Sequence, residues 1–223
     1  MTRIFIYEYA SARPSAAGMP ESIRVEGRAM LTALVQDFFR IPGVEVLTLA
    51  GRFVDEERGA FRVLAGGVDW SVIIAPEFDG LLLERCRWVL EAGGRLLGPS
   101  PEIVDLTGDK WATYQLLKRH GIRTPCTWLD SLRARSVSEG NTSQRFVRKP
   151  RHGAGSHGIG LVHAAAGVEP RADLLTQEMV SGIPASVSFL AGPGGILPLL
   201  PGEQLLSTDG HFRYLGGKLP DRP

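Results

Sequence analysis

Apolar residues in the first hundred positions fall into short runs that are separated by longer amphipathic stretches. The runs predict strands over 3–9, 44–50, 69–76 and 95–98, and the stretches between them predict helices over 20–40, 54–65 and 81–94. The run at 69–76 is almost continuous in apolar residues, which is typical of a parallel strand that is covered on both faces. This alternation of strands and helices predicts an α/β fold with an open parallel sheet.

The pattern changes near residue 100. A helix is predicted over 105–122, with Gly121 as its stop signal. Beyond it, short β-type runs predict strands over 145–150, 159–164, 174–180, 185–191, 204–208 and 211–216. The pair Asp209-Gly210 between the last two runs is a strong hairpin signal. We therefore expect a second, α+β region, and we place the boundary between the two regions at about 100–107.

The composition is that of a folded protein, with 43% hydrophobic and 22% charged residues in a chain of 223. The formal net charge of +1 gives no electrostatic reason to expect nucleic acid or an anionic membrane as a partner. No apolar run approaches membrane-spanning length, and Glu8 interrupts the apolar N-terminal run. The two cysteines, Cys86 and Cys126, are too far apart for a C-x-x-C site. These features predict a cytoplasmic protein with two inert thiols.

The segment Phe146–Val162 carries the clearest sign of chemistry. Its residues Gly153, Gly155 and Gly158 spell G-x-G-x-x-G, the fingerprint of dinucleotide-binding sites. That fingerprint requires a helix that begins at the third glycine, whereas the residues after Gly158 favour a strand. An NAD-type oxidoreductase is therefore a disfavoured alternative. A Walker A loop is excluded because no Gly-Lys-Ser/Thr follows the glycines.

The same segment can instead form a glycine-rich loop between two antiparallel strands. Glycines let backbone N–H groups approach phosphate oxygens without interference from a Cβ atom. Ser156 adds a hydroxyl group, and Lys149 adds a point charge at the end of the preceding strand. A surface hairpin without a ligand has the same pattern, so the loop alone leaves both interpretations open.

Two other segments accompany this loop in a fixed order. Lys110 follows an acidic residue at the head of a helix, and T-Q-E-M-V is followed by a short polar turn and another strand. With the K-P…G-A-G-S-H-G-I segment, they resemble the ATP-grasp superfamily. Within it, residues 5–31 and 73–82 resemble the N-terminal domain of the tyramine–glutamate ligase group of methanofuran biosynthesis. The resemblance implies an N-terminal Rossmann-like pre-ATP-grasp domain over 1–105, an ATP-grasp lid subdomain over 106–182, and an incomplete C-terminal ATP-grasp subdomain over 183–223.

The resemblance also implies a function, which is the ATP-dependent ligation of a small-molecule carboxylate to an amine through an acylphosphate, with ATP and Mg²⁺ as cofactors. Lys110 and Lys149 match the two lysines that hold the α- and β-phosphates. The lid that closes over the phosphates is matched by Gly153, Gly155, Ser156 and Gly158. The hinge that binds adenine is matched by Gln177, Glu178, Met179 and Val180, with backbone groups of Glu178 and Val180 at the edge of the ring.

The acceptor substrate is expected at the N-terminal domain, because open parallel sheets bind ligands at the carboxyl ends of their strands. Glu8 and Glu77 follow from this as candidate ligands of an ammonium group. No metal site is predicted in the chain, since Asp221 is its only acidic candidate after the last hairpin. The alternatives are thus a ligase that is completed by another polypeptide, and a non-catalytic nucleotide-binding module. The expected partners are a second copy of the chain in a homodimer, or that completing polypeptide.

Overall fold

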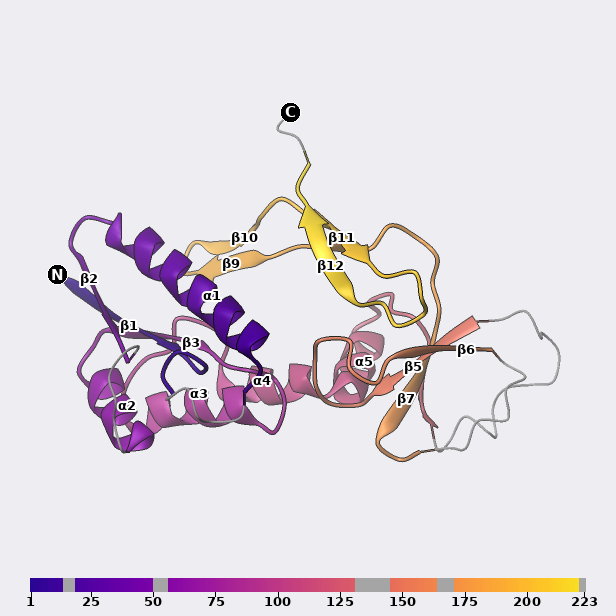
Figure 1. The fold of residues 1–223 in the computed structure, drawn as a ribbon, viewed down its shortest axis with the longest axis horizontal. Coiled ribbons are helices and arrows are strands. Elements are labelled where there is room, and N and C mark those ends of the chain that lie inside the picture. The colour runs from indigo at the N-terminus through magenta and orange to yellow at the C-terminus, as the bar shows by residue number, and fades with distance from the viewer. Residues whose placement is uncertain (14–18, 50–55, 131–144, 164–170, 221–223) are drawn as a thin grey trace. The chain divides into compact units, whose positions relative to one another are not determined.

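The structure is a computed structural model, and it describes residues 1–13, 19–49, 56–130, 145–163 and 171–220. The chain divides into two units, Met1–Gly108 and Asp109–Pro223, which are described separately below. Both are drawn as ribbons in Figure 1. Asp221, the acidic candidate near the end of the chain, lies outside the described residues, as do the ends of the predicted elements 44–50, 54–65 and 159–164.

Unit 1 is built on a parallel sheet, as the sequence predicts. Its strands are β1 (Thr2–Glu8), β2 (Val44–Thr48) and β3 (Trp70–Ile74), in the order β2-β1-β3, and both pairings are parallel. The predicted fourth strand at 95–98 is reduced to a single parallel bridge between Ser71 and Leu96. The connecting helices are α1 (Glu21–Phe39), α2 (Glu57–Gly66) and α3 (Leu81–Glu91).

The central strand β1 is buried on both faces, because its side chains alternate between two clusters. Phe5 and Tyr7 pack in one cluster with residues of α2 and α3, among them Phe61 and Trp88. Ile4 and Ile6 pack in the other cluster with Leu31 of α1. Helices thus cover both faces of the sheet, which explains the continuous apolar runs in the sequence (Figure 1).

The helix predicted over 105–122 is wrong in its extent. The structure has α4 (Pro101–Gly108) and α5 (Lys110–Arg119), and Asp109 between them has an extended backbone with φ −100° and ψ 102°. The Asp109 carboxylate accepts the N–H groups of Trp111 and Ala112, so it caps the second helix. Because of this cap, Lys110 is the first residue of α5 and lies at the junction between helix and cap.

Unit 2 contains an antiparallel four-stranded sheet. Its strands are β4 (Thr127–Leu129), β5 (Arg145–Pro150), β6 (Gly160–His163) and β7 (Leu174–Glu178), in the order β4-β7-β5-β6. The strands predicted near 145–150, 159–164 and 174–180 are confirmed, whereas the three-residue β4 was not predicted. The side chains of Phe146 in β5 and of Leu175 and Thr176 in β7 are buried.

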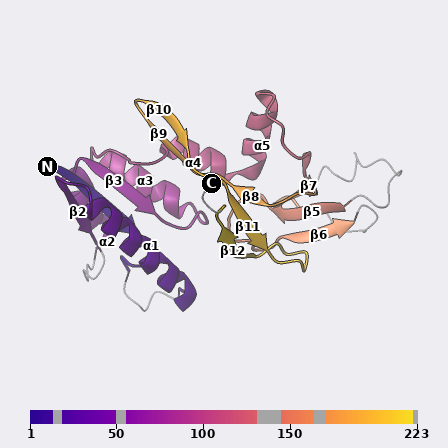
Figure 2. The same cartoon turned by 90° about the horizontal axis from the view of Figure 1, so that it is seen from above.

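The remaining strands of unit 2 are short: β8 (Ala185–Ser186), β9 (Phe189–Gly192), β10 (Gly195–Pro198), β11 (Gly202–Leu206) and β12 (Tyr214–Lys218). The single strand predicted over 185–191 is wrong, because β8 pairs with β11 whereas β9 pairs with β10. The predicted hairpin around Asp209-Gly210 is confirmed by the antiparallel pairing of β11 with β12. The turn of this hairpin is seen near β6 in Figure 2.

Candidate functional site

The ammonium group of Lys149 is held by an amide oxygen rather than by a carboxylate. Its Nζ donates to Oε1 of Gln177 on the neighbouring strand β7, at 2.7 Å. The Gln177 Nε2 donates in turn to the Thr127 hydroxyl at 2.8 Å, and that hydroxyl donates to the Pro125 carbonyl at 3.0 Å. This chain of donors fixes the Gln177 amide with its carbonyl oxygen toward the lysine.

The charge of Lys149 is not neutralised by any carboxylate ion pair among the residues that the structure describes. Burial lowers the pKa of this lysine, and the nearby positive charge of Lys110 lowers it further. A partly buried cation without a counter-ion costs folding free energy. The arrangement therefore favours the binding of an anion, which would raise the pKa of Lys149 again.

Lys110 joins the start of α5 to the glycine loop, a name that we use for residues 151–159. Its Nζ donates to the Gly153 carbonyl at 2.5 Å, and its backbone N–H donates to the Arg151 carbonyl at 3.1 Å. Arg151 also donates to both carboxylate oxygens of Asp109, at 2.8 and 2.5 Å. This pair holds the pKa of Asp109 at about 2. The first lysine of the candidate site is thus fixed to the loop by several contacts.

The glycine loop connects β5 to β6, which pair antiparallel, so it is a loop between two strands. No helix follows Gly158, as the dinucleotide fingerprint would require, because the chain enters β6. Gly153, Gly155 and Gly158 all have positive φ, and so does Ser156, at 60°. At Gly158, with φ of 66°, a Cβ atom would lie only 3.0 Å from Cγ of Pro150. The local backbone thus explains the glycines at this loop, and it disfavours the NAD interpretation.

The predicted hinge residues lie at and just beyond the end of β7. The Glu178 N–H donates to the Cys126 carbonyl at 2.8 Å, and the Met179 N–H donates to the Arg145 carbonyl at 3.1 Å. The Glu178 N–H thus has an acceptor within the protein, and the binding of the adenine ring by backbone groups of Glu178 and Val180 stays a prediction. Val180 follows the strand and is 65% exposed, so its place at a ring edge stays a prediction. The Gln177 side chain has the further role of holding Lys149.

The two glutamates predicted for the acceptor substrate differ in their surroundings. Glu8, at the end of β1, is 5% exposed, and its carboxylate accepts the N–H groups of Ala10 at 2.9 Å and Ser11 at 2.6 Å. It lies against α1, where a Cβ at Gly27 would be 2.5 Å from its Oε1. Glu8 thus stabilises the turn after β1, whereas Glu77 is exposed after β3. Their binding of an ammonium group stays a prediction.

Sequence reasoning missed a polar cluster next to β1 of unit 1. Glu57 accepts hydrogen bonds from the Tyr7 hydroxyl, from Arg13 at 3.0 Å and from Arg85 at 3.4 Å. The Arg85 guanidinium lies 4.9 Å from the ring centroid of Tyr9 and 4.5 Å from that of Trp88. Burial and the contact with Glu57 raise the pKa of Tyr7 far above its usual range. The residues of this cluster are far apart in sequence, so no local sequence pattern predicts it.

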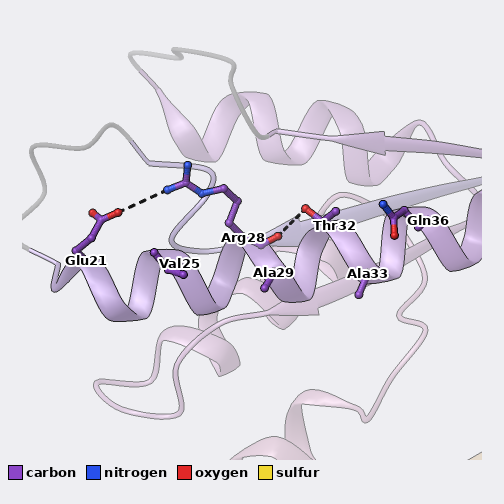
Figure 3. A pocket seen from close by; sticks show the side chains of 7 residues that line it. All are labelled: Glu21, Val25, Arg28, Ala29, Thr32, Ala33 and Gln36. Carbon is purple, nitrogen blue, oxygen red and sulfur yellow. Dashed lines mark hydrogen bonds and ion pairs between the residues drawn. The ribbon is translucent and has the colours of Figure 1, made fainter.

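A hollow on the outer face of α1 is not part of the candidate site. Its lining comes from one helix, where Arg28 forms an ion pair with Glu21 and its carbonyl accepts the Thr32 hydroxyl (Figure 3). No candidate residue lines it. In the described part of the chain no three His, Cys, Asp or Glu side chains come together to hold a metal ion. Likewise, none of the described helices is long and apolar enough to cross a membrane.

Comparison with known families gives two matches that together span most of the chain. Residues 107–222 match the ATP-grasp domain, and residues 42–104 match the pre ATP-grasp 3 domain. The first match covers more than half of the chain, and it includes both lysines, the glycine loop and the hinge. The chain belongs to the ATP-grasp family.

Individual relatives agree with this assignment. The chain is 24% identical to the tyramine–L-glutamate ligase of Methanocaldococcus fervens, over 97% of its own length and 70% of that protein's. An ATP-grasp superfamily protein from Archaeoglobus fulgidus has the same fold, with a TM-score of 0.69 at 24% identity, over 100% of this chain and 66% of the other. The D-alanine–D-alanine ligase of Bacillus anthracis in complex with ATP gives 0.63 at 13% identity, over 100% and 72%. The chain thus spans about two thirds of the length of these proteins.

Proposed function

We propose that the chain binds ATP at the Lys110–Lys149 site and that it acts as an ATP-dependent carboxylate–amine ligase. The observation that carries the proposal is Lys149, a partly buried ammonium group held by a neutral amide beside a second lysine. Two cationic groups next to a glycine loop suit the phosphates of a nucleotide. Membership of the ATP-grasp family supports ATP as that nucleotide, and the names of the relatives support ligation.

In this proposal, each part of the site has one task. Lys149 and Lys110 bind the α- and β-phosphates, and the N–H groups of the glycine loop approach the phosphate oxygens. Gly153, Gly155, Ser156 and Gly158 close over them and exclude water. Residues 177–180 lie beside the adenine ring. The substrate carboxylate takes the terminal phosphoryl group as ADP leaves, and an amine then displaces phosphate from the acyl carbon, which yields an amide.

The ligands of a metal ion cannot be assigned among the described residues. ATP-grasp proteins use ATP with Mg²⁺, which needs oxygen ligands such as carboxylates. Among the described residues, no three His, Cys, Asp or Glu side chains come together to hold such an ion.

Nucleotide binding tests the first half of the proposal. Calorimetry should show binding of ATP or ADP in preference to NAD. Lys149→Ala should weaken ATP binding about tenfold to a hundredfold, because it removes a charge-assisted contact. Lys118→Ala is the matched control, since Lys118 is an exposed lysine of α5, with Nζ 5.7 Å from the Tyr114 ring centroid. Binding of NAD without binding of ATP would overturn the proposal.

Acylphosphate trapping tests the second half. The protein is incubated with ATP, Mg²⁺, hydroxylamine and a panel of amino acids and other small carboxylic acids. An acylphosphate reacts with hydroxylamine to form a hydroxamate, so a ligase should form hydroxamate only with its own acid and only with ATP. ATP binding without any hydroxamate would instead support the non-catalytic nucleotide-binding module.

A further inference from the structure

The glycine loop and the segment after it contact a turn that comes about fifty residues later in the chain. This hairpin turn, residues 207–213, joins β11 to β12. Ser156 Oγ donates to the Phe212 carbonyl at 2.8 Å, and the Leu161 N–H donates to the Gly210 carbonyl at 3.0 Å. His211 Nδ1 lies 2.9 Å from the Ile159 carbonyl, which only accepts, so the ring donates in this contact.

Ser156 and Phe212, which are joined by the first of these hydrogen bonds, both have an unusual backbone conformation. Ser156 has φ of 60° and Phe212 has φ of 52°, and Asp79 is the only other described residue besides glycine with positive φ. Such conformations cost free energy for residues with a side chain, and they persist where the surrounding structure imposes them. Two strained residues that meet in one hydrogen bond indicate that the loop and the turn impose each other's conformation.

The Asp209 carboxylate stabilises the hairpin turn from within. Its Oδ1 accepts the Ser207 hydroxyl at 2.7 Å and the His211 N–H at 3.0 Å, and its Oδ2 accepts Arg213 Nη2 at 2.5 Å. Gly210 has φ of 83°, and a Cβ there would lie 3.3 Å from the Leu161 Cβ. Asp209 thus arranges the turn, and Gly210 lets it approach β6 closely.

We propose that the hairpin turn is the positioning element of the glycine loop, with Asp209 as its organising residue. The contacts to Ser156 and Ile159 hold the second half of the loop, and the contact to Leu161 holds the strand β6 that follows it, in the conformation that presents the N–H groups of the loop to phosphate. Lys110 holds the first half through the Gly153 carbonyl. This inference rests on the proposed nucleotide site, because it assigns how that site is shaped.

Asp209→Ala tests the inference, because it removes the acceptor of three hydrogen bonds in the turn without touching the glycine loop. We expect ATP affinity to fall about threefold to tenfold, as for the loss of one or two hydrogen bonds. Adenosine has no phosphate, so its affinity should not change. The backbone amide of Leu161 should exchange faster with solvent, since its acceptor lies in the turn.

Two further variants serve as controls, and a third tests coupling. Asp209→Asn keeps an oxygen for Ser207 and the His211 N–H, so it should restore most of the affinity. Asp173→Ala removes an exposed aspartate that binds Arg171 in a similar pair at 2.6 Å, and it should have no effect on ATP binding. The double variant Ser156→Ala, Asp209→Ala should weaken ATP binding no more than the stronger single variant. Both substitutions disrupt the same connection, which joins the glycine loop to the hairpin turn.

The outcomes separate this inference from the proposed function. Failure of the unaltered protein to bind ATP overturns the proposed function, and the inference with it. If the protein binds ATP and Lys149→Ala weakens that binding, but Asp209→Ala leaves ATP affinity unchanged, the inference alone is wrong. An equal loss of ATP and adenosine affinity in Asp209→Ala would assign Asp209 a general structural role and would also overturn it.

Discussion

Two arginines and one lysine of the segment Arg145–Arg151 meet different partners. Arg148 donates to the Asp130 carboxylate at 3.0 and 2.5 Å, and Arg151 donates to Asp109 at 2.8 and 2.5 Å. Lys149, between them in sequence, donates to an amide oxygen. Neighbouring cations at the end of β5 and the start of the glycine loop thus divide into charges that bind carboxylates and a charge that does not.

The difference shows how one short segment carries both charges that stabilise the fold and a charge that can bind a ligand. A planar guanidinium matches two carboxylate oxygens, so the arginines fix the ends of β4 and α5 to the sheet. An ammonium group on a flexible stem suits a phosphate, and a carboxylate beside it would compete for that phosphate. Arg148 and Arg151 are thus paired within the protein, while the charge of Lys149 can bind an anion from outside.

The largest effect is expected at the buried arginine pair. Asp130 is 6% exposed and also accepts hydrogen bonds from the Thr176 hydroxyl at 2.6 Å and the Arg171 N–H at 3.0 Å. Asp130→Ala should lower the free energy of unfolding by about 3 kcal/mol or more, because it leaves buried donors without this carboxylate. Urea denaturation measures the change. The control is Asp173→Ala, an exposed pair, with an expected change below about 1 kcal/mol.

A smaller effect is expected at Asp109, which caps α5 and binds Arg151. Asp109→Ala should cost about 2 kcal/mol at neutral pH, from the lost cap and ion pair. The folded protein holds the pKa of Asp109 at about 2, below its ordinary value of 3.8. This stabilisation is therefore complete above pH 3.8 and is lost as the pH falls toward 2. Between these limits, the stability of Asp109→Ala should fall less steeply with acid than that of the unaltered protein, and parallel curves would contradict the assignment.

The smallest effect on stability is expected at Lys149. Lys149→Met keeps the length of the side chain and removes the buried charge, but it leaves the Gln177 oxygen without its donor. These two effects oppose each other, so the free energy of unfolding should change by less than about 1 kcal/mol. A loss above about 2 kcal/mol, as at the arginine pairs, would make Lys149 a structural residue and would erase the contrast.

The sequence predicted the parts of this picture that local patterns determine. The parallel sheet, the loop between β5 and β6 and the place of Lys149 follow from apolar runs and glycine spacing. The break between α4 and α5 at Asp109 was not predicted, because one acidic residue within a helical pattern does not distinguish an exposed position from a cap. The pairs Arg148–Asp130 and Arg151–Asp109 join residues that are 18 and 42 positions apart, and only the fold brings them together.

The C-terminal strands show the same limit. The hairpin signal at Asp209-Gly210 predicted a turn, but its contact with Ser156 spans 56 positions and has no local pattern. The apolar residues of 185–191 predicted one strand, whereas the chain divides them between two sheets. Register and partner choice in these short strands depend on pairing that the sequence pattern does not specify.

The central claim is that Lys149 keeps its charge for the phosphates of a nucleotide, and its pKa tests this claim most directly. Heteronuclear NMR of the lysine side chains, with Lys149→Ala to assign the signal, follows the titration with and without ATP. In the free protein, burial and Lys110 should place the pKa of Lys149 below its ordinary value of 10.5, and saturating ATP should raise it. A pKa at or above 10.5 in the free protein that ATP leaves unchanged would contradict the account.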